Sequence, residues 1–195
     1  MNIWAAVALA VVVAGVCGAL SGYFVACCGV QPMVVTLGGS FLFTGVALLV
    51  SNLSATESYK GISGFPDSFL QISKFKLFGV IPCQVIIFLV LAVIAYVLLT
   101  KYGRMVFLIG VNKDAAEFSG INTRLITMTT YILSGISAAI AGIILTSYIG
   151  TAKSDIGVTF TLPIITAVVL GGTLSTGGKG SVVGTALAAV VIGVL

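Results

Sequence analysis

Apolar and polar positions follow one another along this 195-residue chain in long blocks. Apolar runs cover residues 3–25, 33–51, 80–100 and 125–149. Each is close to the roughly 20 residues that a helix needs to cross the hydrocarbon core of a bilayer. The pattern therefore predicts four membrane-spanning helices. The first is not a cleaved signal, because no Lys or Arg precedes Lys60.

The region after Pro163 has a different pattern. Residues 164–170 and 182–195 are apolar, and the glycine-rich residues 171–180 separate them. Each apolar arm is too short to span a bilayer comfortably. The pattern predicts a broken or re-entrant helix, which survives at membrane depth only where protein or a watery cavity covers it. The predicted fold class is therefore all-α, a polytopic transmembrane bundle of about five to six spans that includes this broken helix.

Composition supports a membrane protein and excludes several functions. The chain is 59% hydrophobic and 7% charged, whereas a soluble domain carries roughly 25% charged residues. The formal net charge of +4 comes from scattered residues with no basic face, which argues against nucleic-acid binding. With no histidine and no Cys-x-x-Cys motif, no metal site is predicted, and the four cysteines are interpreted as packing residues.

Two polar segments separate the predicted spans. Residues 101–124 hold four basic residues and residues 52–79 hold three, so the positive-inside rule favours a cytoplasmic 101–124 segment by a margin of one. Residues 114–118 predict a short helix, with Asn112 as its N-cap and Gly120 as its stop. From spacing alone, this segment is either a contact point for a soluble partner or an ordinary solvated loop.

Glycines mark further features. Gly18 with Gly22, Gly135 with Ala139, and Ala138 with Gly142 form small-x-x-x-small pairs that predict close helix packing. Residues 172–181 invite a nucleotide-binding interpretation, which fails because Gly178 stands where a P-loop needs lysine. Glycines there instead let a helix break and backbones approach closely. No catalytic residue is predicted, because the five acids are dispersed and none lies within a predicted span, which also argues against a proton-driven carrier.

Four blocks of residues together resemble the permease subunits of ABC importers for ribose-type sugars and related small polyols. The blocks are residues 31–38, residues 103–104 with 109–121, residues 131–142, and residues 170–185. Their order and spacing look like those of the family across most of the chain. Residues 55–66 and 154–170 look like the autoinducer-2 import branch of that family.

The resemblance implies a single permease domain over residues 1–195 in the bacterial inner membrane. ATP would be bound by partner subunits and not by this chain. The implied partners are ABC ATPase subunits, a second permease subunit, a substrate-binding protein and membrane lipid. Family members have further spans before the first one here and extend past residue 195, so we expect truncation at both ends. A secondary transporter or channel, or a non-functional truncated permease, is the alternative.

The resemblance also assigns candidate sites. Residues 101–124 would be a cytoplasmic coupling loop that meets the ATPase, and residues 52–79 would be periplasmic. The candidate ATPase-coupling residues are Gly103, Arg104, Asn112, Ala115, Ala116, Glu117 and Gly120. The candidate translocation-pathway residues are Thr36, Gly38, Phe41, Gly171, Gly172, Thr173, Gly177, Gly178 and Gly180. Asn52 and Asp155 are further candidates for substrate contact.

Overall fold

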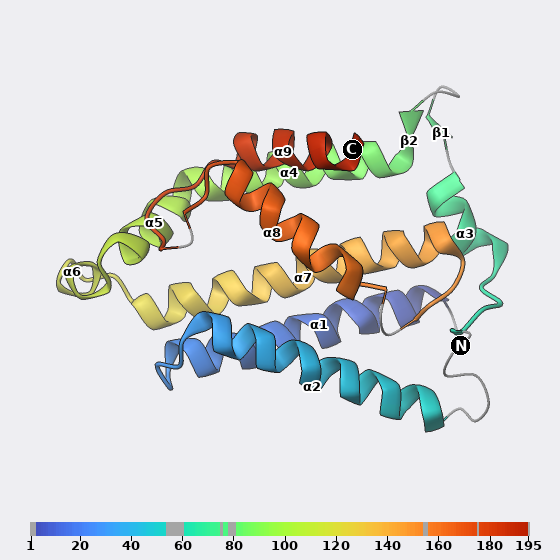
Figure 1. Cartoon of the computed structure of the whole chain (residues 1–195), viewed down its shortest axis with the longest axis horizontal. Coiled ribbons are helices and arrows are strands. Elements are labelled where there is room, and N and C mark those ends of the chain that lie inside the picture. Colours follow the sequence, from blue (N-terminus) through green and yellow to red (C-terminus); the bar gives the residue numbers. More distant parts are fainter. Residues whose placement is uncertain are drawn as a thin grey trace. The chain divides into compact units, whose positions relative to one another are not determined.

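Helices dominate the computed structural model, which describes residues 3–53, 61–74, 76–77, 81–153, 156–174 and 176–194. Three of the described helices are long and apolar enough to cross a membrane: α1 (Ile3–Ala26), α2 (Pro32–Leu53) and α7 (Thr123–Ile149) (Figure 1). A fourth span is formed if α4 (Cys83–Lys101) and α5 (Gly103–Val111) count as one helix bent by 67°. The prediction of an all-α, polytopic bundle is confirmed.

The remaining elements are short. They are α3 (Asp67–Lys74), β1 (Lys76–Leu77), β2 (Ile81–Pro82), α6 (Lys113–Phe118), the 3-10 helix η1 (Val158–Phe160), α8 (Thr161–Leu170) and α9 (Val182–Val194). The two-residue strands pair antiparallel. The chain divides into two compact units, residues 1–84 with 127–157 and residues 85–126 with 158–195.

The predicted broken helix is present as α8 and α9 in the second unit. Pro163 lies in the first turn of α8, where its missing N–H costs no helical bond. Helix α8 ends in a Schellman motif, because Gly172 has φ +89° and the Thr173 N–H donates to the Val168 carbonyl at 3.2 Å. Ser181 caps α9, since its Oγ accepts from the Gly184 N–H at 3.1 Å. Each arm is thus terminated by local hydrogen bonds.

Glycines bring α1 and α7 together in the first unit. A Cβ atom on Gly18 would lie 2.5 Å from the Tyr131 carbonyl oxygen, and one on Gly135 would lie 2.5 Å from the Ala14 carbonyl oxygen. Real Cβ contacts are essentially never this short, so both backbones approach as only glycine allows. The predicted packing role of Gly18 and Gly135 is confirmed, whereas that of Gly142 is wrong, because a Cβ there would meet nothing within 4 Å among the described residues.

The predicted polar segment 52–79 contains a helix of its own. Its helix α3 buries Phe69, which stays 4% exposed and lies with its ring 5.2 Å from that of Phe65. The buried Ser147 hydroxyl on α7 donates to the Phe69 carbonyl at 2.8 Å. Ile62, which precedes α3, and Ala152, which follows α7, form an antiparallel bridge, so these two segments lie against each other.

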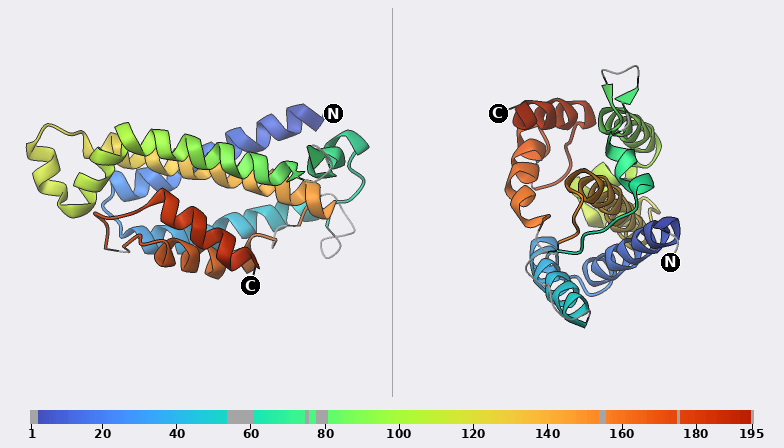
Figure 2. Two further views of the ribbon diagram at one scale, coloured as in Figure 1. Left: turned by 90° about the horizontal axis from the view of Figure 1, so that it is seen from above. Right: turned by 90° about the vertical axis from the view of Figure 1, so that its right-hand side faces the viewer.

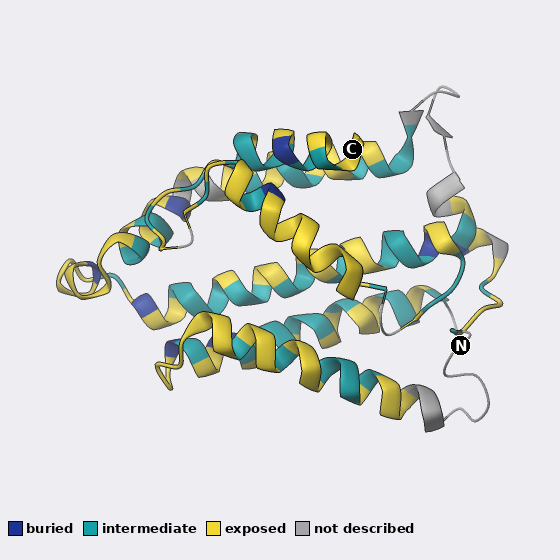
Figure 3. Cartoon of the chain, viewed as in Figure 1, coloured by how far each residue is buried: buried dark blue, intermediate teal, exposed yellow. Residues whose placement is uncertain are grey.

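Most large apolar residues on the described helices are exposed, and Figure 3 shows exposed residues along each of the long helices. Among the described residues, the buried apolar ones are Ala26, Phe69, Ala116, Ala167 and Ala188. Four of these five are alanines, so helix contacts use small residues while the long side chains point outward. In a bilayer such faces meet lipid or further protein at no solvation cost, whereas in water they would drive aggregation.

Candidate functional site

Helix α6 is a short polar helix whose two ends are both fixed by hydrogen bonds. Asn112 is its N-cap, as predicted, because its Oδ1 accepts from the Ala115 N–H at 3.1 Å. Gly120 is its stop, also as predicted, with φ +81° and an N–H that donates to the Glu117 carbonyl at 2.9 Å. The Ile121 N–H closes the Schellman motif on the Ala116 carbonyl at 3.1 Å.

The two central alanines of α6 differ in exposure. Ala115 is exposed, whereas Ala116 is buried, with an exposed fraction of 4%. Only Ala115 can therefore meet a partner directly, and Ala116 holds α6 against its own chain. A change at Ala115 tests docking, while a larger side chain at Ala116 would disturb packing first.

Glu117 attaches α6 to the beginning of α7. The hydroxyl of Thr123, the first residue of α7, donates to Glu117 Oε1 at 2.5 Å. Thr123 is 2% exposed, so this bond is shielded on one side from water. A carboxylate beside a helix N-terminus is also favoured by the helix dipole. The structure thus assigns Glu117 a contact within the chain that the sequence did not reveal.

Gly103 and Arg104 lie at the start of α5, while Asn112, Ala115, Ala116, Glu117 and Gly120 belong to α6 and its caps. Gly103 is buried and Arg104 is exposed. The predicted coupling residues therefore form two groups, one at each end of α5.

Sequence reasoning passed over Phe118. This last residue of α6 is 93% exposed, more than any other large apolar side chain among the described residues. An aromatic residue within a polar segment between two apolar runs was the available signal. Exposed aromatic side chains of this kind often anchor protein interfaces.

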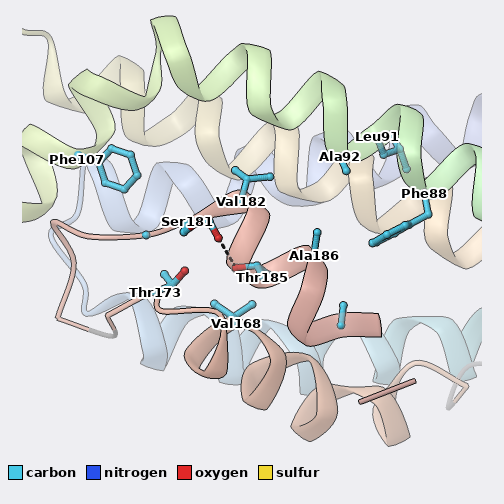
Figure 4. A pocket seen from close by; sticks show the side chains of 12 residues that line it. Phe88, Leu91, Ala92, Phe107, Val168, Thr173, Ser181, Val182, Thr185 and Ala186 are labelled. Atoms are coloured by element: carbon cyan, nitrogen blue, oxygen red, sulfur yellow. Dashed lines mark hydrogen bonds between the residues drawn. The ribbon is translucent and has the colours of Figure 1, made fainter. Parts of the chain in front are cut away.

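The second unit contains a cavity of about 430 Å³. It is bounded by α4, α5, the C-terminal part of α8, the glycine segment and α9, and Figures 1 and 2 show α9 beside α4. Its lining includes Thr173 and Gly180 from the predicted pathway residues, together with Phe107 of α5 and Phe88 of α4 (Figure 4). The cavity is partly open, and its lining is mostly apolar.

Few polar groups reach this cavity. The Thr185 hydroxyl donates to the Ser181 carbonyl at 2.9 Å, and the Ser181 hydroxyl already caps α9 (Figure 4). Among the described residues that line the cavity, Thr173 carries the third hydroxyl group. A small polar solute needs several well-placed donors and acceptors. This cavity alone offers too few of them.

The other predicted glycines of the break make backbone contacts. Gly171 packs against the backbone of Thr185, and Gly184 packs against the Gly171 carbonyl, each more closely than any Cβ would permit. Gly177 and Gly178 instead approach Gly110 of α5. The glycine segment therefore contacts both the other arm of the broken helix and the helix that leads into α6.

Thr36, Gly38 and Phe41 lie on α2, in the first unit, and do not line the cavity. The Thr36 hydroxyl donates to the Pro32 carbonyl at 3.0 Å, and a Cβ on Gly38 would meet nothing within 4 Å. Phe41 is 79% exposed. Asp155 and the side chain of Asn52 lie outside the described residues.

Residues 1–195 match the family model described as branched-chain amino acid transport system / permease component. The chain is 42% identical over 193 residues to the autoinducer 2 import system permease protein LsrD of Photorhabdus luminescens, covering 98% of this chain and 58% of that protein. The LsrD proteins of Yersinia pseudotuberculosis serotype O:3 (strain YPIII) and Yersinia enterocolitica serotype O:8 are also 42% identical, over 192 residues each. These alignments cover 97% of this chain and 57% and 58% of the two proteins. No solved structure matches the chain.

Proposed function

Because the chain belongs to the family of branched-chain amino acid transport system permease components, we propose that it serves as a permease subunit of an ATP-driven importer. It forms part of the translocation pathway for a small sugar-like solute, with autoinducer-2 as the leading candidate. The names of its 42% identical relatives favour this solute over a branched-chain amino acid. It binds no ATP itself and takes energy from separate ATPase subunits.

The observation that carries this proposal is the construction of α6. Caps at Asn112 and Gly120 fix its two ends, and the Glu117 carboxylate accepts a bond from α7. Its exposed residues include Ala115 and Phe118. A rigid, pre-organised helix binds a partner without first losing conformational entropy. An ordinary solvated loop would need none of these bonds.

The proposed mechanism links α6 to the broken helix. ATP closes the partner ATPases, α6 moves with them, and the α8–α9 break shifts so that the pathway opens alternately to each side. Such coupling requires contacts that differ between the two states. A second permease subunit completes the pathway, and a substrate-binding protein delivers the solute on the side of residues 52–79 and 149–162. The site of action is the bacterial inner membrane, with α6 in the cytoplasm.

The test is Ala115→Glu in the assembled importer, with Ala115→Ser as the matched control. Ala115 is exposed on a short helix, so both variants should insert and fold. Ala115→Glu should abolish uptake and the stimulation of ATP hydrolysis by the binding protein, and Ala115→Ser, whose side chain stays small and uncharged, should leave both intact. Normal uptake and stimulated hydrolysis with Ala115→Glu would refute the docking role of α6.

A secondary transporter or channel is the competing class. Co-purification separates the two classes, because a permease of an ATP-driven importer retains an ATPase subunit. Uptake driven by an ion gradient, with the isolated permease in liposomes and no ATP, would contradict the proposal.

A further inference from the structure

One face of α5 contacts the glycine segment. Phe107, Gly110 and Val111 have the i, i+3, i+4 spacing that places side chains on one side of a helix. A Cβ on Gly110 would lie 2.5 Å from the Gly178 nitrogen, and one on Gly178 would lie 2.7 Å from Val111 Cγ2. A Cβ on Gly180 would lie 3.4 Å from Phe107 Cε1. The contact therefore extends over a full turn of α5.

The centre of this contact is backbone against backbone. A Cβ on Gly177 would lie 2.9 Å from the Gly110 carbonyl oxygen, so neither side has room for a side chain. At Gly110, the described residues place no side chain between α5 and Gly177 or Gly178 that could absorb a displacement. Closely packed protein transmits strain because it compresses little. A shift of α5 at this point must therefore move the turn.

Hydrogen bonds join the described residues of the turn, 174 and 176–179. The Leu174 N–H donates to the Lys179 carbonyl at 3.1 Å, and the Gly177 N–H donates to the Leu174 carbonyl at 3.0 Å. Gly177 and Gly178 have φ values of +88° and +81°, which side-chain-bearing residues rarely adopt. These described residues can therefore move together, carrying the ends of α8 and α9 with them.

The position of Gly110 gives this contact its significance. Gly110 lies two residues before Asn112, the N-cap of α6, and Phe107 lines the cavity with Thr173 and Gly180. Every element of the contact belongs to the second unit. Only Val111 separates Gly110 from the N-cap of α6. A movement of α6 therefore passes to Gly110, and from Gly110 to the broken helix and its cavity.

We propose that Gly110 is a positioning residue, and that its contact with Gly177 and Gly178 is the joint that transmits movement of α6 to the α8–α9 break. This inference rests on the proposed function and specifies how α6 acts on the pathway. It assigns a role to a glycine outside the candidate set, and it gives Gly177 and Gly178 a mechanical role in place of contact with the solute.

The test replaces Gly110 with alanine in the assembled importer. Gly110 is helical with a negative φ, so its backbone conformation accepts alanine. The alanine Cβ would nevertheless clash with the backbone of Gly178. Gly193→Ala on α9 is the matched control, because a Cβ there meets nothing within 4 Å. We expect Gly110→Ala to insert and retain the ATPase subunit, while solute taken up per ATP hydrolysed falls about tenfold, within the usual range of allosteric coupling. Gly193→Ala should keep the normal ratio.

A second variant, Val111→Ala, tests the same contact in case Gly110→Ala does not fold. Val111→Ala removes methyl groups from the joint without introducing a clash, and Val111 is 73% exposed, so the helix should tolerate it. We expect a smaller fall in uptake per ATP. If Gly110→Ala fails to insert, the test relies on Val111→Ala. An unchanged amount of solute taken up per ATP hydrolysed in Val111→Ala would then refute the proposed role of the Gly110 contact.

The two proposals fail differently. If the chain is not a permease of an ATP-driven importer, no ATPase subunit co-purifies with the unaltered protein and uptake does not depend on ATP. If only the joint is wrong, the unaltered importer is ATP-driven and Gly110→Ala transports with a normal ratio of solute to ATP.

Discussion

The crossing of α1 and α7 provides a quantitative test of the fold through Gly18→Ala. The new Cβ would lie 2.5 Å from the Tyr131 carbonyl oxygen, where ordinary contact begins at 3.4 Å. The helices must therefore separate locally by about 0.9 Å, or the side chain must distort, and overpacking of this kind costs about 1–3 kcal/mol. Alanine also favours a helix over glycine by about 1 kcal/mol. The net loss in the free energy of unfolding should be about 0–2 kcal/mol, and the difference from a glycine-to-alanine change without a clash should be about 1–3 kcal/mol.

Gly142→Ala is the matched control for this crossing. Gly142 is also on α7, and a Cβ there meets nothing within 4 Å. It gains the same helix propensity without the clash, so its free energy of unfolding should stay level or rise slightly. The assay is SDS titration of the purified protein in detergent, followed by circular dichroism. Equal stabilities for Gly18→Ala and Gly142→Ala would show that α1 and α7 do not cross as described.

Two hydrogen-bond deletions should loosen different segments. Thr123→Val removes the hydroxyl that donates to Glu117, and amide exchange in α6 should rise about fivefold, equivalent to about 1 kcal/mol of local stability. Thr123→Ser keeps the hydroxyl and should restore most of the protection. Ser147→Ala removes the donor to the Phe69 carbonyl, and exchange should rise by a similar factor in α3 alone. Hydrogen exchange with mass spectrometry checks both, and a rise in the wrong helix, or none, would contradict the assignment.

Features determined by local sequence could be predicted. The four long apolar runs, the break after Pro163, and the caps of α6 at Asn112 and Gly120 depend on neighbouring residues, and all are present. Hydrophobic length and capping chemistry are readable without knowledge of distant contacts. The small-residue pairs that contain Gly18 and Gly135 also indicated packing faces, although they did not indicate which helices would meet.

Features that depend on distant contacts could not be predicted. Helix α3 lies in a segment rich in breakers, and its Phe69 is buried only through contacts such as the bond from Ser147 on α7. Gly110 resembles any packing glycine, since its partners Gly177 and Gly178 lie more than sixty residues away. The alternation of exposed Ala115 and buried Ala116 also requires the fold. Spacing alone contains none of this information.

The candidate pathway residues illustrate the same limit. Thr173 and Gly180 line the cavity, but Thr36, Gly38 and Phe41 lie on exposed surface of α2. Small and hydroxyl residues occur both in pathways and in helix packing. Which role each one takes depends on the neighbouring helices. The chain spans 58% of the length of the Photorhabdus relative, so the composition of the whole pathway is a proposal.

Photocrosslinking from α6 tests the central claim most directly. The photoreactive residue p-benzoyl-phenylalanine replaces Phe118 in the assembled importer, and in a parallel control it replaces Phe41 on α2. The two side chains are 93% and 79% exposed, so the label is accessible at either position. We predict that irradiation of membrane vesicles joins position 118, and not position 41, to the ATPase subunit. No adduct from position 118, or an equal yield from position 41, would contradict the assignment of α6 as the docking helix.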